Sequence, residues 1–320
     1  MIALLRSKGL LSIILLGGGE PTLHRDFVEI VRFIKEKGLE LGIVTNGSRL
    51  DRVSEIAAEL EENDWIRISI DAAREETFRD LHRPRGKVTL ERVLAEAKSI
   101  KERNPAVSLG YSFVIVWKGM DVNGNRLSPN TEEISEAVAL ARKHSFDYVS
   151  LKPCLIRLED SQRESLLDGV NRKREEEIAE EIRGHLRKAK EVANGHIKIL
   201  ESVNLKAMLN QETERIKRQP KRCHMPFFRT VVTPLGIFHC PAFRGIEKGR
   251  IAEGDGYSTD ADFTESLRKT AQSISTFDAE TECRVIGCLY NEANWWVEDL
   301  IDSDTAMREI GEVEDNNFFL

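Results

Sequence analysis

The sequence LLSIILLGGGEP at residues 10–21 decides how the first half of this chain folds. An apolar run at 10–16 leads directly into three glycines, a glutamate and a proline. The run is far shorter than the about 20 apolar residues that span a bilayer, and it lacks the small-x-small cleavage site of a secretory signal. It therefore predicts a buried strand that ends in a tight turn.

The turn at the end of this strand is also a candidate ligand site. A dinucleotide-binding loop would require glycine where the chain has Thr22, and Glu20 in the middle of the loop would repel phosphate. A carboxylate beside exposed glycine main chain is better suited to a cationic amine, because main-chain carbonyl oxygens act as further acceptors. An ordinary turn between a strand and a helix is the alternative.

Beyond the turn, short apolar runs alternate with amphipathic segments as far as residue 152. Helices are predicted around Val31, around Ile56 and at 90–103, and Asn130 with Glu133 forms a capping-box pattern at the start of another. This alternation predicts the α/β class with parallel strands and right-handed crossovers. The predicted strands lie at 10–16, 41–45, 66–71, 107–116 and 148–152.

Three of the predicted strands carry polar side chains on one face. Between 66 and 71, period-two alternation places three isoleucines on one face and Arg67, Ser69 and Asp71 on the other. The segments 108–113 and 149–152 alternate in the same way. A polar face cannot pack against helices, so we expect a wet, ligand-binding interior in an open or incomplete barrel, with ligands at the carboxyl ends of the strands. A doubly wound sheet is the alternative.

The motif Gly18-Gly19-Glu20-Pro21 resembles the GGEP motif of the radical S-adenosylmethionine (SAM) superfamily. The elements that follow are similar as well, with VTNG at 44–47, SID at 69–71 and HRP at 82–84. From residue 10 to about residue 153, the resemblance implies an α/β partial (β/α)6 barrel that lacks its first strand. A small cysteine-rich C-terminal extension with a β-hairpin would follow it.

The resemblance also implies a binding site for SAM. In such a site the two glycines and the glutamate of the motif hold the methionyl amino group. Ser69 and Arg83, or Arg85 in its place, are candidates for contacts with the carboxylate or the ribose. The complete implied cofactor-binding set is Gly18, Gly19, Glu20, Pro21, Thr45, Asn46, Ser69, Asp71 and Arg83.

One part of the family pattern is not found in this sequence. Members of the superfamily carry CxxxCxxC in the loop after the first strand, and these thiolates hold the 4Fe-4S cluster that binds SAM. No cysteine precedes Cys154 here. We therefore expect a chain cut off before its cluster-binding segment and unable by itself to form the 5'-deoxyadenosyl radical, with no catalytic residue assigned and that cluster present only in an intact parent protein.

Four of the five cysteines lie in the last third of the chain, at Cys223, Cys240, Cys283 and Cys288. Twelve residues separate Cys223 from Gly236, and three separate Gly236 from Cys240. This spacing resembles the SPASM and twitch extensions of the same superfamily, with one residue fewer in the second gap. Since a full SPASM extension has more cysteines, the resemblance implies one auxiliary 4Fe-4S cluster at most, held by these four thiolates.

Two further interpretations of these cysteines remain open. A hairpin formed by 227–232 and 236–239 would bring the first two cysteines together, and the same four thiolates could instead hold structural zinc, with His224 and His239 as spare ligands. Unligated buried thiols are the other alternative. Cys154, at the end of a predicted strand, is interpreted as a packed thiol.

Composition limits the class of protein. The chain has 320 residues, 41% of them hydrophobic and 32% charged, which is enough for a large core in one large or two linked domains, and two are predicted, at 1–205 and 206–320. A net charge of -7 gives none of the field that a general nucleic-acid binder needs, and we expect no nucleic-acid or membrane partner. The cysteine usage predicts a reducing cytoplasm. The basic run at 215–222 is interpreted as solvated surface, with anion binding as the lesser alternative.

Two functions follow as hypotheses. In the first, the intact protein is a radical SAM enzyme that cleaves SAM reductively and abstracts hydrogen from a peptide or small metabolite, with electrons from a donor such as flavodoxin or ferredoxin. In the second, the chain is a non-catalytic binding protein on a decayed barrel, braced by a structural four-cysteine zinc site. Metal content separates the two.

Overall fold

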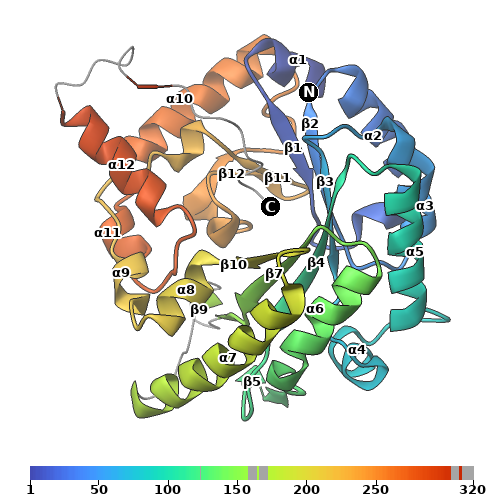
Figure 1. The fold of residues 1–320 in the computed structure, drawn as a ribbon. Coiled ribbons are helices and arrows are strands. Elements are labelled where there is room, and N and C mark those ends of the chain that lie inside the picture. The colour runs from blue at the N-terminus through green and yellow to red at the C-terminus, as the bar shows by residue number, and fades with distance from the viewer. Residues whose placement is uncertain (123, 158–163, 166–171, 304–309, 312–320) are drawn as a thin grey trace. The chain divides into compact units, whose positions relative to one another are not determined.

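The computed structural model describes residues 1–122, 124–157, 164–165, 172–303 and 310–311 (Figure 1). These residues fall into two units. One contains Leu10–Cys154 together with 172–205, and the other contains Met1–Gly9 with the described residues of 155–170 and 206–316.

The first unit is built on one parallel sheet of six strands. The spatial order of the strands follows the order along the chain without a reversal, which is the arrangement of an open barrel and excludes the doubly wound alternative. The predicted α/β class and parallel pairing are therefore confirmed. In spatial order the strands are β1 (Ser12–Leu15), β2 (Glu40–Thr45), β3 (Trp65–Ser69), β4 (Ser108–Ile115), β7 (Tyr148–Pro153) and β10 (Lys198–Glu201).

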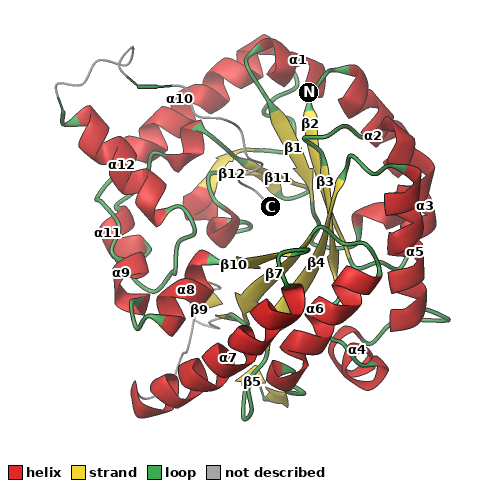
Figure 2. Ribbon diagram, viewed as in Figure 1, coloured by secondary structure: helices red, strands yellow, loops and turns green. Residues whose placement is uncertain are grey.

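Helices cover one face of this sheet (Figure 2). Ile66, Ile68 and Ile70 point toward them and are fully buried, which agrees with the alternation seen in the sequence. Each such side chain removes apolar surface from water and contributes roughly 1.5–3 kcal/mol relative to an exposed position. The helices of the first unit are α2 (Phe27–Glu36), α3 (Leu50–Ile56), α4 (Glu75–His82), α5 (Leu90–Arg103), α6 (Ile134–Lys143), α7 (Arg172–Ala193) and the start of α8 (Val203–Leu209).

Two features of the strands differ from the sequence-based expectation. The sixth strand, β10, was not predicted, because its short alternating segment follows a long charged stretch and helix α7. The first strand, β1, was expected to be buried, and this is wrong. Among the described strands it pairs with β2 alone, at the edge of the sheet, and Leu11 and Leu16 beside it are 70% and 62% exposed.

The predicted capping box at Asn130 is also wrong. Asn130 precedes a short 3-10 segment, η3 (Thr131–Glu133), and makes no side-chain capping bond. Its amide instead donates to the carbonyl oxygens of Asp71 (2.7 Å) and Val114 (2.8 Å), so it joins the ends of two strands. The Asn130 side chain thus makes long-range hydrogen bonds in place of the local helix cap that the sequence predicts.

The second unit contains a three-stranded antiparallel sheet of β11 (Val231–Thr233), β12 (Gly236–Phe238) and β13 (Arg250–Ala252). The predicted hairpin is confirmed in β11 and β12, although 227–230 do not extend its first strand. Among the described residues, no helix is both long and apolar enough to cross a membrane. The helices of this unit are α1 (Ile2–Ser7), the end of α8, α9 (Thr213–Lys217), α10 (Asp260–Thr276), α11 (Ala279–Glu282) and α12 (Asn291–Ile301).

Short elements complete the description. The two-residue strands form two small antiparallel ladders. They are β5 (Asp121–Val122) with β6 (Asn125–Arg126), and β8 (Ile156–Arg157) with β9 (Glu164–Ser165). The other 3-10 segments are η1 (Pro21–Leu23), η2 (Ala57–Glu59), η4 (Met225–Phe227), η5 (Pro241–Phe243) and η6 (Glu247–Gly249).

Candidate functional site

The glycine turn after β1 leaves its main chain open. A Cβ atom on Gly17 would lie 1.9 Å from the carbonyl oxygen of Gly19, so only glycine permits this turn. At Gly18 and Gly19 the position of a Cβ has no atom within 4 Å, and both residues are exposed. The peptide groups of this turn are therefore accessible to a ligand.

The carboxylate of Glu20 joins two loops at the carboxyl end of the sheet. Its Oε1 accepts hydrogen bonds from the Thr22 amide (3.1 Å), the Thr22 hydroxyl (2.7 Å) and the Thr45 hydroxyl (2.8 Å). Its Oε2 accepts from the Asn46 amide over 2.7 Å. A carboxylate has about four acceptor positions, two on each oxygen, so Oε2 retains the remaining acceptor capacity. The structure thus brings Glu20, Thr45 and Asn46 together as a unit.

Arg52 holds the chain that follows the glycine turn. Its guanidinium donates to the carbonyl oxygens of Thr22 (3.0 Å) and Arg25 (2.8 Å) and also to that of His24. Pro21 occupies the first position of η1, where its missing N–H leaves no donor unsatisfied. The turn, η1 and helix α3 are therefore fixed relative to one another before any ligand binds.

Asp71, another residue of the predicted site, is engaged in the structure of the barrel. Its φ of 54° is left-handed, and its Oδ1 accepts from the Val114 amide over 2.7 Å. Its Oδ2 lies 3.1 Å from Nε2 of His82. These contacts tie β3 to β4 and to helix α4, so Asp71 positions the elements around it. A ligand that binds the Asp71 carboxylate would have to share its oxygens with Val114 and His82.

Ser69 and Arg83 differ in their surroundings. Ser69 is half-buried and lies in one row across the sheet with Ser112 and Ser150, all on the face opposite the helices. Arg83 follows α4 in a left-handed conformation with a φ of 45°, and its side chain is exposed. No hydrogen bond or ion pair within the described parts of the chain joins Arg83 to Glu20 or to Ser69, so the predicted site is not assembled around it.

The polar face of the sheet carries two cations, Arg67 and Lys152, and the phenol of Tyr148, which the sequence pattern had not indicated as part of the site. Arg67, Gly110 and Tyr148 are aligned across β3, β4 and β7. A Cβ on Gly110 would lie 2.0 Å from the Tyr148 ring, which therefore crosses the strand at that glycine. Tyr148 is 1% exposed, and among the described residues its hydroxyl has no hydrogen-bond partner. This arrangement depends on the register in which the three strands pair, so the sequence of any one strand does not reveal it.

Lys152 lies on the same face, nearer the carboxyl end of β7. Burial lowers the pKa of its ammonium to about 8, and the positive charge of Arg67 acts in the same direction, while Asp71 opposes both. Burial likewise raises the pKa of the Cys154 thiol to about 11. The face is thus polar as predicted, and the half-buried cations Arg67 and Lys152 lie on it near the carboxylate of Asp71.

The four cysteines of the predicted metal site are thiols without disulfide bonds. Burial raises the pKa of Cys223 to about 12, and nearby Cys240 and Cys288 raise it further. Cys288 is affected in the same way, with a pKa raised to about 11 by burial and by Cys240. These three sulfurs are therefore within electrostatic reach of one another. Cys283 packs on the same apolar cluster as Cys223 and Cys240.

The described residues do not, however, form a ready metal site. No group of three or more histidine, cysteine, aspartate or glutamate side chains in that part of the chain is arranged to hold a metal ion. The two histidines considered as spare zinc ligands have other partners, since Nε2 of His224 contacts Glu298 and Nδ1 of His239 lies 3.1 Å from the Ser273 hydroxyl. The four-cysteine site therefore stays a prediction.

Comparisons with known proteins agree with the resemblance seen in the sequence. Residues 1–122 match the sequence profile of the radical SAM superfamily. A segment of 75 residues is 39% identical to the S-adenosylmethionine-dependent nucleotide dehydratase of Selenomonas ruminantium, over 23% of this chain and 27% of that protein. The probable GTP 3',8-cyclase of Metallosphaera sedula is 30% identical over 139 residues, or 42% of this chain and 38% of that protein. The chain thus spans less than half the length of these curated relatives.

Solved structures show the same fold. SuiB of Streptococcus suis bound to S-adenosylmethionine superposes with a TM-score of 0.59 over 94% of this chain and 65% of that chain, at 15% identity. SuiB bound to the precursor peptide SuiA gives a TM-score of 0.56 over 94% and 64%, at 14% identity. The match of residues 1–122 to the radical SAM profile and the shared fold of these structures agree with each other, and the predicted partial-barrel architecture is confirmed.

Proposed function

We propose that the glycine turn after β1 binds the methionyl end of SAM, and that the intact protein is a radical SAM enzyme. The observation that carries this proposal is the open main chain of Gly18 and Gly19 beside a carboxylate whose Oε2 can accept a further hydrogen bond. An ammonium group has three donors and no acceptor, so carbonyl and carboxylate oxygens are its natural partners. Thr45 and Asn46 would act by positioning Glu20.

The reaction proposed for the intact protein is a one-electron cleavage of SAM. SAM held in this site would supply the chemistry, since one electron from a donor such as flavodoxin or ferredoxin would split its sulfur–C5' bond into methionine and a 5'-deoxyadenosyl radical able to take a hydrogen atom from the substrate. The 4Fe-4S cluster that supplies this electron needs thiolates, and no cysteine precedes Cys154 in the sequence. The part of this chain in the reaction is to bind and orient SAM.

The substrate is proposed to be a peptide or a small metabolite. SuiB has been solved with a precursor peptide, and another relative is a nucleotide dehydratase, so both classes occur among similar proteins. Arg67 and Lys152 on the polar face favour a ligand that carries negative charge there, because the positive charge of Arg67 lowers the pKa of Lys152 and a bound anion would act with Asp71 against this effect. An anionic substrate satisfies this requirement in either class.

An auxiliary 4Fe-4S cluster at Cys223, Cys240, Cys283 and Cys288, in a SPASM-like or twitch-like extension, is part of the same proposal. Electrostatic proximity of three of the thiols supports it. Because the described side chains do not form a metal-binding group, no step of the reaction is derived through this cluster.

Calorimetric titration of the 320-residue chain with SAM tests the proposed binding site. Gly18→Ala and Gly19→Ala should leave the fold intact, since each new methyl group enters open space, but should weaken SAM binding by about tenfold or more because that space is then lost to the ligand. Gly254→Ala, which also meets no atom within 4 Å, is the matched control and should bind SAM normally. Unchanged binding in both turn variants would refute the site.

A further inference from the structure

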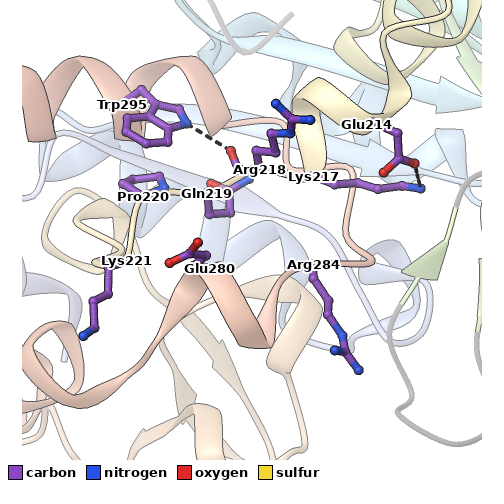
Figure 3. Close-up of a pocket in the computed structure, with 9 residues that line it drawn as sticks. All are labelled: Glu214, Lys217, Arg218, Gln219, Pro220, Lys221, Glu280, Arg284 and Trp295. Carbon is purple, nitrogen blue, oxygen red and sulfur yellow. Dashed lines mark hydrogen bonds and ion pairs between the residues drawn. The ribbon is translucent and has the colours of Figure 1, made fainter.

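A cavity of about 410 Å³ lies in the second unit, and the basic run at 215–222 contributes part of its lining (Figure 3). Its walls come from the end of α9, from residues 218–221, from α11 and from α12. The volume lies within the range of small-molecule and side-chain pockets, about 300–1,000 Å³. Nothing in the proposed binding of SAM uses this cavity.

The loop that lines the cavity is fixed by side chains of α12 and by the start of α11. The carbonyl oxygen of Arg218 accepts hydrogen bonds from the Asn291 amide group (2.6 Å) and from the indole N–H of Trp295 (3.0 Å). The Ala279 amide donates to the carbonyl oxygen of Lys221 over 2.8 Å. The cavity is therefore formed before a ligand arrives, which reduces the ordering cost of binding.

The charges around the cavity are unbalanced. Lys217 is paired with Glu214 at 2.7 Å. Within the described residues, the other three cations, Arg218, Lys221 and Arg284, have no carboxylate at ion-pair distance, and Glu280 is the other acid in the lining. A local excess of positive charge in a chain of net charge -7 attracts an anionic partner.

The directions of the side chains indicate what kind of anion fits. In Figure 3 the ends of Arg218, Lys221 and Arg284 point away from one another, so they do not converge on one small ion. Trp295, 40% exposed, presents an indole beside Pro220, which gives the cavity an apolar wall. We infer that this cavity binds an acidic peptide segment, with an apolar or aromatic side chain against Trp295 and carboxylates spread over the surrounding cations.

The inference is tested by fluorescence anisotropy with the full chain and a labelled synthetic peptide in which glutamates flank one phenylalanine. The peptide should bind, should be released by added salt because the contacts are exposed charges, and should bind far better than its lysine counterpart. Equal binding of both peptides would overturn the inference. Inorganic phosphate binding at this cavity while the peptide does not would overturn it as well.

Substitutions in the cavity lining test whether the peptide binds at this place. Arg218→Gln with Lys221→Gln should weaken the acidic peptide about two- to fivefold for each charge removed, and Trp295→Ala should weaken it about tenfold. Glu280→Gln should strengthen binding, since it removes a negative charge of the cavity lining that repels the carboxylates of the peptide. Lys269→Gln removes an exposed cation of α10 outside the cavity and is the control. The inference is wrong if Lys269→Gln lowers affinity as much as the cavity variants do.

Discussion

The hydroxyl of Thr45 donates a hydrogen bond of 2.8 Å to Oε1 of Glu20, across 25 positions of the sequence. The bond joins the chain after β1 to the end of β2, and the Thr45 hydroxyl in turn accepts from the Gly47 amide over 3.1 Å. Glu20 thus holds the loops in place before it contacts any ligand.

Thr45→Val tests this positioning role. The substitution keeps the shape of a buried side chain but removes one donor to Glu20 and the acceptor of the Gly47 amide, so the free energy of unfolding should fall by about 1–2 kcal/mol. Denaturant unfolding measures the change. Thr264→Val, at an exposed position of α10, should change it by less than about 0.5 kcal/mol. An equal effect at both positions contradicts the role.

Glu133 should be more important for stability than its neighbour Glu132. Glu133 is buried, and its Oε2 accepts from the amides of Ala73 (2.6 Å) and Arg74 (3.0 Å) while its Oε1 accepts from the Thr77 hydroxyl. Glu133→Gln places an NH₂ group against donors and should lower the free energy of unfolding by about 1–3 kcal/mol. Glu132→Gln is the exposed control, and similar melting temperatures for the two variants would speak against this arrangement.

The half-buried Lys152 predicts a pH dependence of stability. Its pKa of about 8 in the folded chain is below the ordinary value of 10.5, because of burial and the charge of Arg67, with Asp71 opposing. The unfolded chain therefore binds more protons between pH 8 and 10.5, and the free energy of unfolding contributed by this group rises with pH across that window. The cost of the buried charge is fully present below pH 8.

Lys152→Met checks this prediction. Removing the ammonium should abolish the increase of the free energy of unfolding between pH 8 and 10.5. It should also raise the free energy of unfolding at neutral pH by roughly 1–3 kcal/mol, measured by denaturant unfolding at several pH values. Lys188→Met, on the exposed side of α7, should leave the profile unchanged. A parental profile that falls between pH 8 and 10.5, relative to Lys152→Met, would mean that the shift has the opposite sign.

Metal analysis after anaerobic isolation tests the four-cysteine prediction. About one 4Fe-4S cluster per chain is expected, with iron and acid-labile sulfide both lost in Cys223→Ser or Cys288→Ser. Cys154→Ser, at the end of β7, should retain both. Zinc without sulfide would instead support the structural zinc site, and metal content independent of all four cysteines would exclude both.

The strands of the barrel could be predicted well because each carries its signal locally. Ile66, Ile68 and Ile70 alternate with polar residues, and the strand and its buried face appear where the alternation places them. Glu20 and the residues at the end of β2 were also identified as one site. Their hydrogen bonds could not be, since these depend on the pairing of β1 with β2.

Other features depend on contacts that no local pattern encodes. Tyr148 reaches across Gly110 only because β4 and β7 pair in one particular register. The basic run at 215–222 was interpreted as solvated surface, and its part in a cavity depends on α12 packing beside it. Asn130 matched a helix cap by sequence but bonds to two strand ends instead.

The position of β1 has a practical consequence for handling the protein. In the part of the chain that the structure describes, no strand pairs with its outer edge, which lies next to exposed leucines, and such an edge is a template on which another extended chain can add. Self-association in concentrated solution is expected to begin there. Exchanging Leu11 or Leu16 for lysine would then improve solubility, because a charge at the margin of a sheet opposes stacking of one molecule on the next.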